Sequence, residues 1–151
     1  MPTYTVRRSA RLNAPATAIY DTIADYRTGH PQIVPPRYFG PIVVERGGRG
    51  EGTVIAYSVK AFGRTIPARA AITEPVPGRQ LVESDLASGL VTTFEVLPDK
   101  NGAGTNVTIS TAIPWRSGVL GAIERIMMRW FLLRVYRQEL SLLESYCQAH
   151  R

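Results

Sequence analysis

A small set of side chains in this sequence could transfer a proton to or from a bound molecule. Such a general acid or base must reach its substrate by a hydrogen bond and must have a pKa shifted toward neutrality. The candidates are Tyr57, Glu83, Asp85, Arg129, Tyr136, Glu139 and His30. By chemistry His30 is the strongest of them, yet its position between Gly29 and Pro31 is typical of a solvated turn residue. The sequence therefore leaves the catalytic residues unassigned.

Nucleophilic, metal and disulfide chemistry find no support in the sequence. Only two histidines are present, His30 and His150, so neither a Ser-His-Asp nor a Cys-His arrangement is supported, and no zinc-ligand spacing occurs. The single cysteine, Cys147, cannot form an internal disulfide, and its helical surroundings indicate a small buried thiol. We expect no metal and no cofactor.

Composition indicates a soluble globular protein formed by one domain, residues 1–151. Hydrophobic residues make up 44% of the chain and charged residues 20%, which are ordinary values for a packed core. The net charge of +6 raises nucleic acid as a partner, but the basic residues are scattered without a basic block, so we expect no nucleic-acid binding. Because we find neither a signal-peptide pattern nor a run of about eighteen apolar residues, we expect a cytoplasmic protein.

Residue periodicity predicts one strand, a helical region, six further strands and a long helix. Residues 4–12 alternate between apolar and polar, as a strand with one buried face does. Residues 13–26 form a helical pattern with Asn13 as candidate cap, and one further helical turn fits before Val34. The later strands are expected at residues 38–46, 53–62, 65–74, 79–86, 90–98 and 105–114, with turn residues between them. A helix of about residues 117–148 follows, with an apolar stripe in its second half.

These elements predict an α+β fold in which a curved, seven-stranded antiparallel sheet wraps around a long C-terminal helix, with one or two short helices after the first strand. The helix has one apolar stripe and the sheet one apolar face, so each covers the other. A helix and a curved sheet diverge along part of their length. We expect a cavity where they do.

Three segments resemble a known family. They are the opening "RLNAPATAIYDTIADY", the turn "PVPGRQLVE" and the closing "YRQELSLLESYCQ". Together with the order of elements, they are similar to the START-like SRPBCC superfamily, whose fold is called helix-grip, and within it to the polyketide cyclase/dehydrase group. The resemblance implies a deep hydrophobic cavity that binds a small molecule such as a lipid, a polyketide or a quinone, and it leaves cyclase/dehydrase-type activity open. Because active residues differ among the cyclases of this superfamily, none is carried over to this chain.

Strand alternation indicates which side chains face this cavity. Lys60, Arg69 and Glu95 are charged and should point to solvent, which turns their neighbours inward. With the helix residues on the apolar stripe, the predicted ligand-binding set is Ile55, Tyr57, Val59, Ala68, Ala70, Thr92, Phe94, Ile109, Thr111, Arg125, Arg129, Leu132 and Tyr136. A mostly apolar lining with a few polar side chains is typical of a small-molecule pocket. The expected partner is a hydrophobic or amphipathic small molecule.

Two arginines share the apolar stripe of the long helix. Arg125 and Arg129 are four residues apart and lie in the same helical sector as Leu132 and Tyr136. Burying them without a partner would cost several kcal/mol each. Three roles therefore stay open: a position at the cavity mouth with the charge in water, an ion pair with an acid of the pocket, or contact with the anionic end of an amphipathic ligand.

The start of the long helix carries apolar residues on more than one face. The segment "IPWRSGVLGAIERIMMRWFLL" contains Trp115, Ile126 and Trp130 with arginines between them. Packing against the sheet explains only one of these faces. The alternative function for the protein is therefore a membrane-surface or protein-interaction module, acting through peripheral membrane contact or homodimerisation.

Overall fold

The computed structural model of the protein describes residues 2–150. Along the chain its elements are β1 (Thr3–Leu12), α1 (Ala16–Ala24), α2 (Gly29–Ile33), β2 (Val43–Arg46), β3 (Val54–Ala61), β4 (Arg64–Val76), β5 (Gln80–Asp85), β6 (Val91–Pro98), β7 (Thr105–Pro114) and α3 (Gly118–Ala149). This is the order that the sequence predicts, with a second short helix after the first strand.

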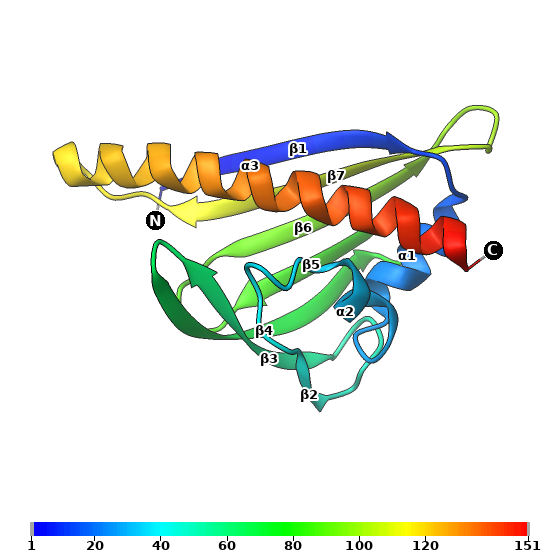
Figure 1. Ribbon diagram of the computed structural model, residues 1–151, viewed down its shortest axis with the longest axis horizontal. Helices are drawn as coiled ribbons and strands as arrows, with labels where there is room; N and C mark the ends of the chain where they lie inside the picture. Colours follow the sequence, from blue (N-terminus) through cyan, green and yellow to red (C-terminus); the bar gives the residue numbers. More distant parts are fainter. Residues whose placement is uncertain (1, 151) are drawn as a thin grey trace.

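The strands form one seven-stranded antiparallel sheet in the order β1-β7-β6-β5-β4-β3-β2. β1 lies at one edge and pairs with β7 along its whole length. Figure 1 shows the sheet curling beneath α3, with α1 and α2 gathered at the end where the C-terminus lies. The predicted α+β arrangement, a long helix held by a curved sheet, is confirmed.

β2 is shorter than predicted. The sequence predicts a strand over residues 38–46, but only Val43–Arg46 forms a ladder with β3. Pro41 has no N–H to donate to a ladder, so regular pairing cannot pass through it. Upstream of the proline, Phe39 makes an isolated bridge with Val59.

The tightly packed part of the core lies under α1 and the second half of α3. Its most deeply buried side chains include Ile19 and Ile23 of α1, Leu143 of α3, and Leu81 and Val96 of the sheet. The first turns of α3 extend beyond this packed end, and Figure 1 shows them reaching past the sheet. Helix and sheet therefore match along only part of their length.

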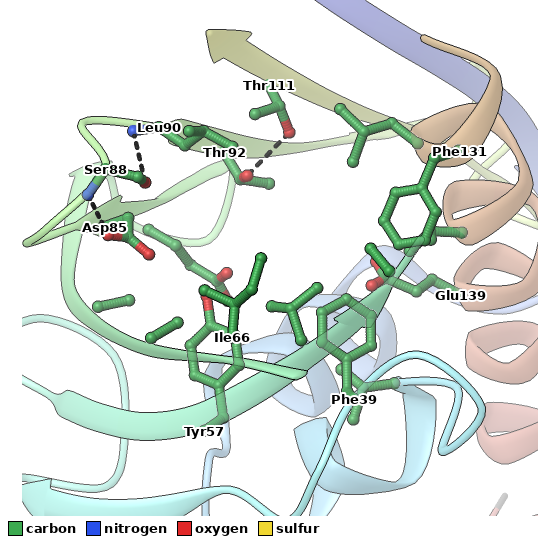
Figure 2. Close-up of a pocket in the computed structure, with 18 of the residues that line it drawn as sticks. Phe39, Tyr57, Ile66, Asp85, Ser88, Leu90, Thr92, Thr111, Phe131 and Glu139 are labelled. Atoms are coloured by element: carbon green, nitrogen blue, oxygen red, sulfur yellow. Dashed lines mark hydrogen bonds between the residues drawn. The ribbon is translucent and has the colours of Figure 1, made fainter. Parts of the chain in front are cut away.

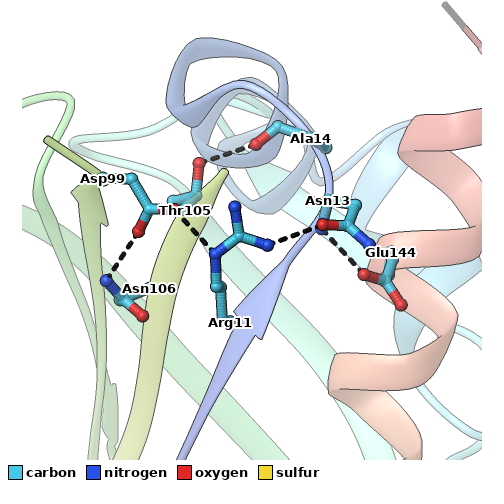
Figure 3. A network of polar contacts seen from close by, with 7 residues as sticks. All are labelled: Arg11, Asn13, Ala14, Asp99, Thr105, Asn106 and Glu144. Atoms are coloured by element: carbon cyan, nitrogen blue, oxygen red, sulfur yellow. Dashed lines mark hydrogen bonds and ion pairs between the residues drawn. The ribbon is translucent and has the colours of Figure 1, made fainter. Parts of the chain in front are cut away.

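A network of polar contacts fixes the turn between β1 and α1 (Figure 3). Arg11 donates from Nε to Asp99 Oδ2 and from Nη1 to Asn13 Oδ1, both at 2.7 Å. The backbone N–H of Asn13 donates to Glu144 Oε2 of α3 at 2.8 Å. Asn13 is not the helix cap that the sequence predicts, because α1 begins after Pro15 without a side-chain cap. The network instead joins β1, the β6–β7 connection and α3 at the packed end.

Replacing Thr105 by valine tests how much this end contributes to stability. Thr105 is fully buried, and its hydroxyl donates to the Ala14 carbonyl at 2.7 Å. Thr105→Val preserves the shape but leaves that carbonyl without its donor, so we expect the free energy of unfolding in urea to fall by roughly 1–2 kcal/mol. Thr108→Val is the control, because the Thr108 hydroxyl contacts Ser9 on the exposed face, and it should change the value by less than about 0.5 kcal/mol. Equal losses of unfolding free energy in Thr105→Val and Thr108→Val would contradict a stabilising role of the hydrogen bond from Thr105 to Ala14.

Candidate functional site

A cavity of about 490 Å³ opens between the concave face of the sheet and α3. Its wall is built from β3, β4, β5, β6 and β7 on one side, α3 on the other, and α2 with the loop after it at one end. Figure 2 shows apolar side chains such as Phe39, Ile66 and Phe131 facing it, with the polar groups of Tyr57, Thr92 and Glu139 among them. The site is therefore mostly apolar with a few polar groups at separate points.

Ten of the thirteen predicted ligand-binding residues lie on the wall of this cavity. They are Ile55, Tyr57, Val59, Ala68, Ala70, Thr92, Phe94, Thr111, Leu132 and Tyr136. Alternation located the strand residues because the charged neighbours do point away from the cavity; Arg69, for example, pairs with Glu45 on the outer face at 2.7 Å. Lining the cavity is what the structure shows, and contact with a ligand stays a prediction.

Ile109, Arg125 and Arg129 lie outside the cavity wall. Ile109 is 1% exposed and belongs to the packed core. Arg125 is half-buried with its guanidinium 5.1 Å from the centre of the Trp115 ring, and Arg129 is exposed. Neither arginine forms an ion pair with any of residues 2–150. Because the first turns of α3 extend past the sheet, the helix side that the sequence assigns to the core meets solvent there.

His30 is buried, so its prediction as a solvated turn residue is wrong. It lies on α2, is 3% exposed and stacks on the Tyr26 ring with 4.3 Å between the centroids. Gly29 makes this position possible, because a Cβ there would lie 2.8 Å from the carbonyl oxygen of Thr22. Only glycine lets α2 approach α1 so closely. In the sequence, Gly29 indicates only a turn. In the structure, it allows the close packing of α2 on α1 that buries His30.

His30 and Glu83 form a polar pair in the cavity wall. His30 Nδ1 lies 2.7 Å from the carbonyl oxygen of Ile23, and because a carbonyl only accepts, Nδ1 carries a proton. The other ring nitrogen, Nε2, lies 3.4 Å from Glu83 Oε1. The same carboxylate oxygen accepts a hydrogen bond of 2.5 Å from the Tyr26 hydroxyl. Burial and the charge of Glu83 raise the pKa of Tyr26, which keeps this phenol neutral and donating.

Glu139 of α3 places a second carboxyl group in the cavity (Figure 2). It is 7% exposed, and its side chain makes no hydrogen bond or ion pair with any other of residues 2–150. Burial, and secondly the charge of Glu83, raise the pKa of Glu139 well above its ordinary value. The protonated form is therefore favoured. A neutral carboxyl group can both donate and accept a hydrogen bond, and here it does neither with any other of residues 2–150.

Hydroxyl groups supply the remaining polar atoms of the wall. Thr92 and Thr111 share a hydrogen bond of 2.8 Å, and Thr111 also bonds the Tyr136 hydroxyl. Burial is the main cause that raises the pKa of Tyr136. The pKa of Tyr57 is raised by burial first and then by the charges of Glu83, Asp85 and Glu139. Both phenols therefore stay protonated at neutral pH.

Asp85 is the third acid of the wall and lies at the end of β5 (Figure 2). Its Oδ1 accepts the backbone N–H groups of Ala87 at 2.8 Å and Ser88 at 2.7 Å, which fixes the turn into β6. Across residues 2–150, no three histidine, cysteine, aspartate or glutamate side chains are arranged to hold a metal ion. The acids of the cavity are thus not arranged as a metal site.

The sequence of residues 3–148 matches the family model described as polyketide cyclase/dehydrase and lipid transport. The chain belongs to this family. Since the match covers nearly the whole chain, the resemblance inferred from the three sequence segments is confirmed. None of the curated proteins matches the chain.

Solved structures show the same fold. The KanY protein (ms6282) is 27% identical with a TM-score of 0.84, and the alignment covers 98% of this chain and 99% of that one. A START superfamily protein from Mycobacterium smegmatis is 15% identical with a TM-score of 0.77, covering 99% and 100% of the two chains. The Zhui aromatase/cyclase from Streptomyces sp. R1128 is 16% identical with a TM-score of 0.71, covering 97% and 94%. The last two likenesses show the fold of this polyketide cyclase/dehydrase and lipid transport family member, and the fold alone.

Glu139→Gln should stabilise the protein more at alkaline than at acidic pH. Because the folded-state pKa of Glu139 is raised, the folded protein keeps a proton that the unfolded chain loses above the ordinary value of 4.5. The contribution of Glu139 to stability is therefore fully present below its ordinary pKa of 4.5 and declines as the pH rises toward the folded-state pKa. The glutamine variant does not titrate, so its advantage in urea unfolding should be wider at about pH 8 than at about pH 5.

Glu124→Gln is the matched control for this experiment. Glu124 lies on the same helix but is exposed and outside the cavity. Its substitution should leave the pH dependence of unfolding close to that of the wild type. If the curves of Glu139→Gln and wild type stay parallel across this range, the raised pKa of Glu139 is refuted.

Proposed function

We propose that the protein binds a hydrophobic or amphipathic small molecule in this cavity, with residues 1–151 acting as one START-like ligand-binding domain. The observation that carries the proposal is the cavity itself. Protein interiors hold few voids larger than a water molecule, whose share of liquid volume is about 30 Å³. A mostly apolar cavity of about 490 Å³ falls within the range of small-molecule sites, about 300–1,000 Å³. Family membership supports the same function.

The polar groups of the wall favour a cyclase/dehydrase-type reaction as the activity that such a protein would add to binding. The His30–Glu83 pair offers a place where one proton can be exchanged, and the neutral forms of Glu139, Tyr57 and Tyr136 can donate hydrogen bonds to a carbonyl. Binding itself does not depend on this chemistry. Mass spectrometry of a guest molecule before and after incubation with the protein separates a carrier, which returns it unchanged, from a cyclase or dehydrase.

Filling the cavity should abolish binding. Ala68 and Ala70 of β4 both line it, so Ala68→Leu and Ala70→Leu each place a larger apolar side chain inside. With N-phenyl-1-naphthylamine as a neutral fluorescent probe, we expect a Kd at least fivefold higher in each variant. Ala71→Leu is the matched control, because Ala71 is the next residue on β4, does not line the cavity, and should leave the Kd unchanged.

Unchanged probe affinity in both cavity variants would exclude this site. Circular dichroism and thermal unfolding of all three variants establish that they keep the fold. Native mass spectrometry of the purified wild-type protein supplies an independent measure, because a retained apolar molecule should be absent from the filled variants.

Docking on an anionic membrane is a second candidate function, and the exposed start of α3 favours it. Seven large apolar side chains of this region are exposed: Trp115, Val119, Leu120, Ile123, Ile126, Met127 and Trp130. At about 100° per residue, the six that lie within α3 fall in an arc of about 120°. This arc is opposite the side of α3 that packs on the sheet. The helix therefore has a second apolar face that no part of residues 2–150 covers.

The charge around this face is complementary to an anionic bilayer. Residues 115–137 contain five arginines and one glutamate, a net charge of +4. The Arg134 guanidinium lies 4.8 Å from the centre of the Trp130 ring, which gives the face the pairing of aromatic and basic groups that suits a lipid headgroup region. None of the helices formed by residues 2–150 has the length and apolar character that crossing a bilayer requires. The proposed contact is therefore peripheral.

A basic groove connects this face with the cavity. The groove has a volume of about 250 Å³ and is lined by Arg37, Lys60 and Arg134, with aromatic rings that include Phe62 and Trp130. Phe62 lines the cavity as well and is half-exposed. A bilayer that meets the start of α3 would thus lie beside the cavity mouth, so an apolar guest could pass between them with little exposure to water.

Vesicle flotation tests the membrane candidate. The protein should float with vesicles of phosphatidylcholine and phosphatidylglycerol and much less with phosphatidylcholine alone, and salt should weaken the binding. Leu120→Ser and Trp130→Ser should reduce flotation strongly, and Arg134→Gln should weaken it about fivefold. Leu97→Ser is the control, because Leu97 is also exposed but lies on β6, away from the start of α3. Flotation that does not depend on lipid charge would contradict the proposal. So would sedimentation as a dimer that forms through this face of α3.

A further inference from the structure

Acids line the cavity wall, and lysines and arginines of residues 2–150 do not. Glu83, Asp85 and Glu139 line the cavity, and none of the lysines or arginines among residues 2–150 does. Among residues 2–150, the only basic group on the wall is the imidazole of His30, which already faces Glu83. A guest molecule therefore meets carboxyl groups and, from residues 2–150, no lysine or arginine that could pair with a negative charge.

Two of these acids have oxygens that the protein leaves without a partner. Glu139 is buried and points toward the cavity (Figure 2), and no hydrogen bond from residues 2–150 reaches its carboxyl group. Asp85 uses Oδ1 for the turn at Ala87 and Ser88, while Oδ2 accepts no hydrogen bond from residues 2–150. These oxygens are accessible from the cavity, because no fully buried side-chain oxygen or nitrogen among residues 2–150 lacks a hydrogen-bond partner. A ligand that donates hydrogen bonds would supply the missing ones.

The acids act on a common region of the cavity. Glu83 and Asp85 are two residues apart on β5, so their side chains project from the same face of the sheet, and Glu139 approaches from α3. The charges of all three contribute to raising the pKa of Tyr57, on the neighbouring wall. A positive group placed near the Tyr57 hydroxyl would be attracted by the carboxylates of β5, and it would favour ionisation of Glu139 by opposing the rise in the pKa of that acid. A negative group would be repelled by the same carboxylates and would raise the pKa of Glu139 further.

We propose that the cavity selects an amphipathic organic cation, a molecule with an apolar body and a protonated amine. The amine is held by Glu139 together with the acids of β5. This inference rests on the proposed function, since it names the class of guest that the same cavity takes. An ammonium group has only donors and a carboxylate only acceptors, so the pair satisfies both. An anionic amphiphile would bring an unpaired negative charge beside the acids of β5 in a mostly apolar site, which is unfavourable.

The experiment compares guests that differ only in charge. Decylamine, decanol and decanoate displace N-phenyl-1-naphthylamine from the full-length protein at neutral pH, each below its micelle concentration. We expect decylamine to bind at least tenfold more tightly than decanoate, with decanol between them. Equal affinities of decylamine and decanoate, or tightest binding of decanol, would overturn the proposal.

Substitutions assign the preference to the acids. Glu139→Gln should lower the ratio of decylamine to decanoate affinity at least fivefold, and Asp85→Asn should lower it independently if the first variant does not fold. Glu124→Gln, on the exposed side of the same helix, should leave the ratio unchanged. A ratio that is the same in all of these proteins would refute the role of the acids. Failure of the neutral probe to bind the wild type at all would overturn the proposed function itself, so the two failures are distinguishable.

Discussion

The contact between α3 and the curved sheet is the constraint on which the rest of the structure depends. A helix presents a nearly straight apolar stripe, whereas a twisted sheet presents a curved face, so the two surfaces match along only part of their length. Where they match, Leu140 and Leu143 complete a packed core. Where they diverge, the inner side of α3 borders a cavity, and none of residues 2–150 covers the outer side. The cavity and the exposed helix face thus have one cause.

Sequence periodicity predicts which way a side chain points, and that was enough for the fold and for most of the cavity wall. It does not predict how far along an element the neighbouring surface extends. Ile109 points inward as alternation requires, but at a filled part of the core, and Arg129 lies on the predicted stripe beyond the reach of the sheet. The burial of His30 was missed for another reason: glycine and proline mark a turn in sequence, whereas the close approach of Gly29 to Thr22 exists only in three dimensions.

The net charge of the chain is opposite in sign to the charged groups that line the cavity. The chain carries +6 overall, which raised nucleic acid as a partner, and the two arginines on the apolar stripe left open an anionic ligand. In the structure the basic groups lie on the surface, where water and salt screen them, while Glu83 and Glu139 lie in the cavity, where screening is weak. The few buried carboxyl groups therefore dominate the field that a guest experiences. A polar guest is sorted by the local charge of the wall and not by the sum over the chain.

The two halves of α3 differ in how firmly they are held, and this bears on how a guest enters. The second half is fixed by the core and by the hydrogen bond between Glu144 and the backbone of Asn13, so the depth of Glu139 in the cavity is set. Within the first half, residues 118–133, Gly121 and Phe131 alone are buried, and segments with few buried contacts open at lower free energy. Opening of the first turns of α3 would therefore cost less free energy than opening of the packed end. A guest that enters beside these turns would still meet Glu139 at a fixed position farther along the same helix.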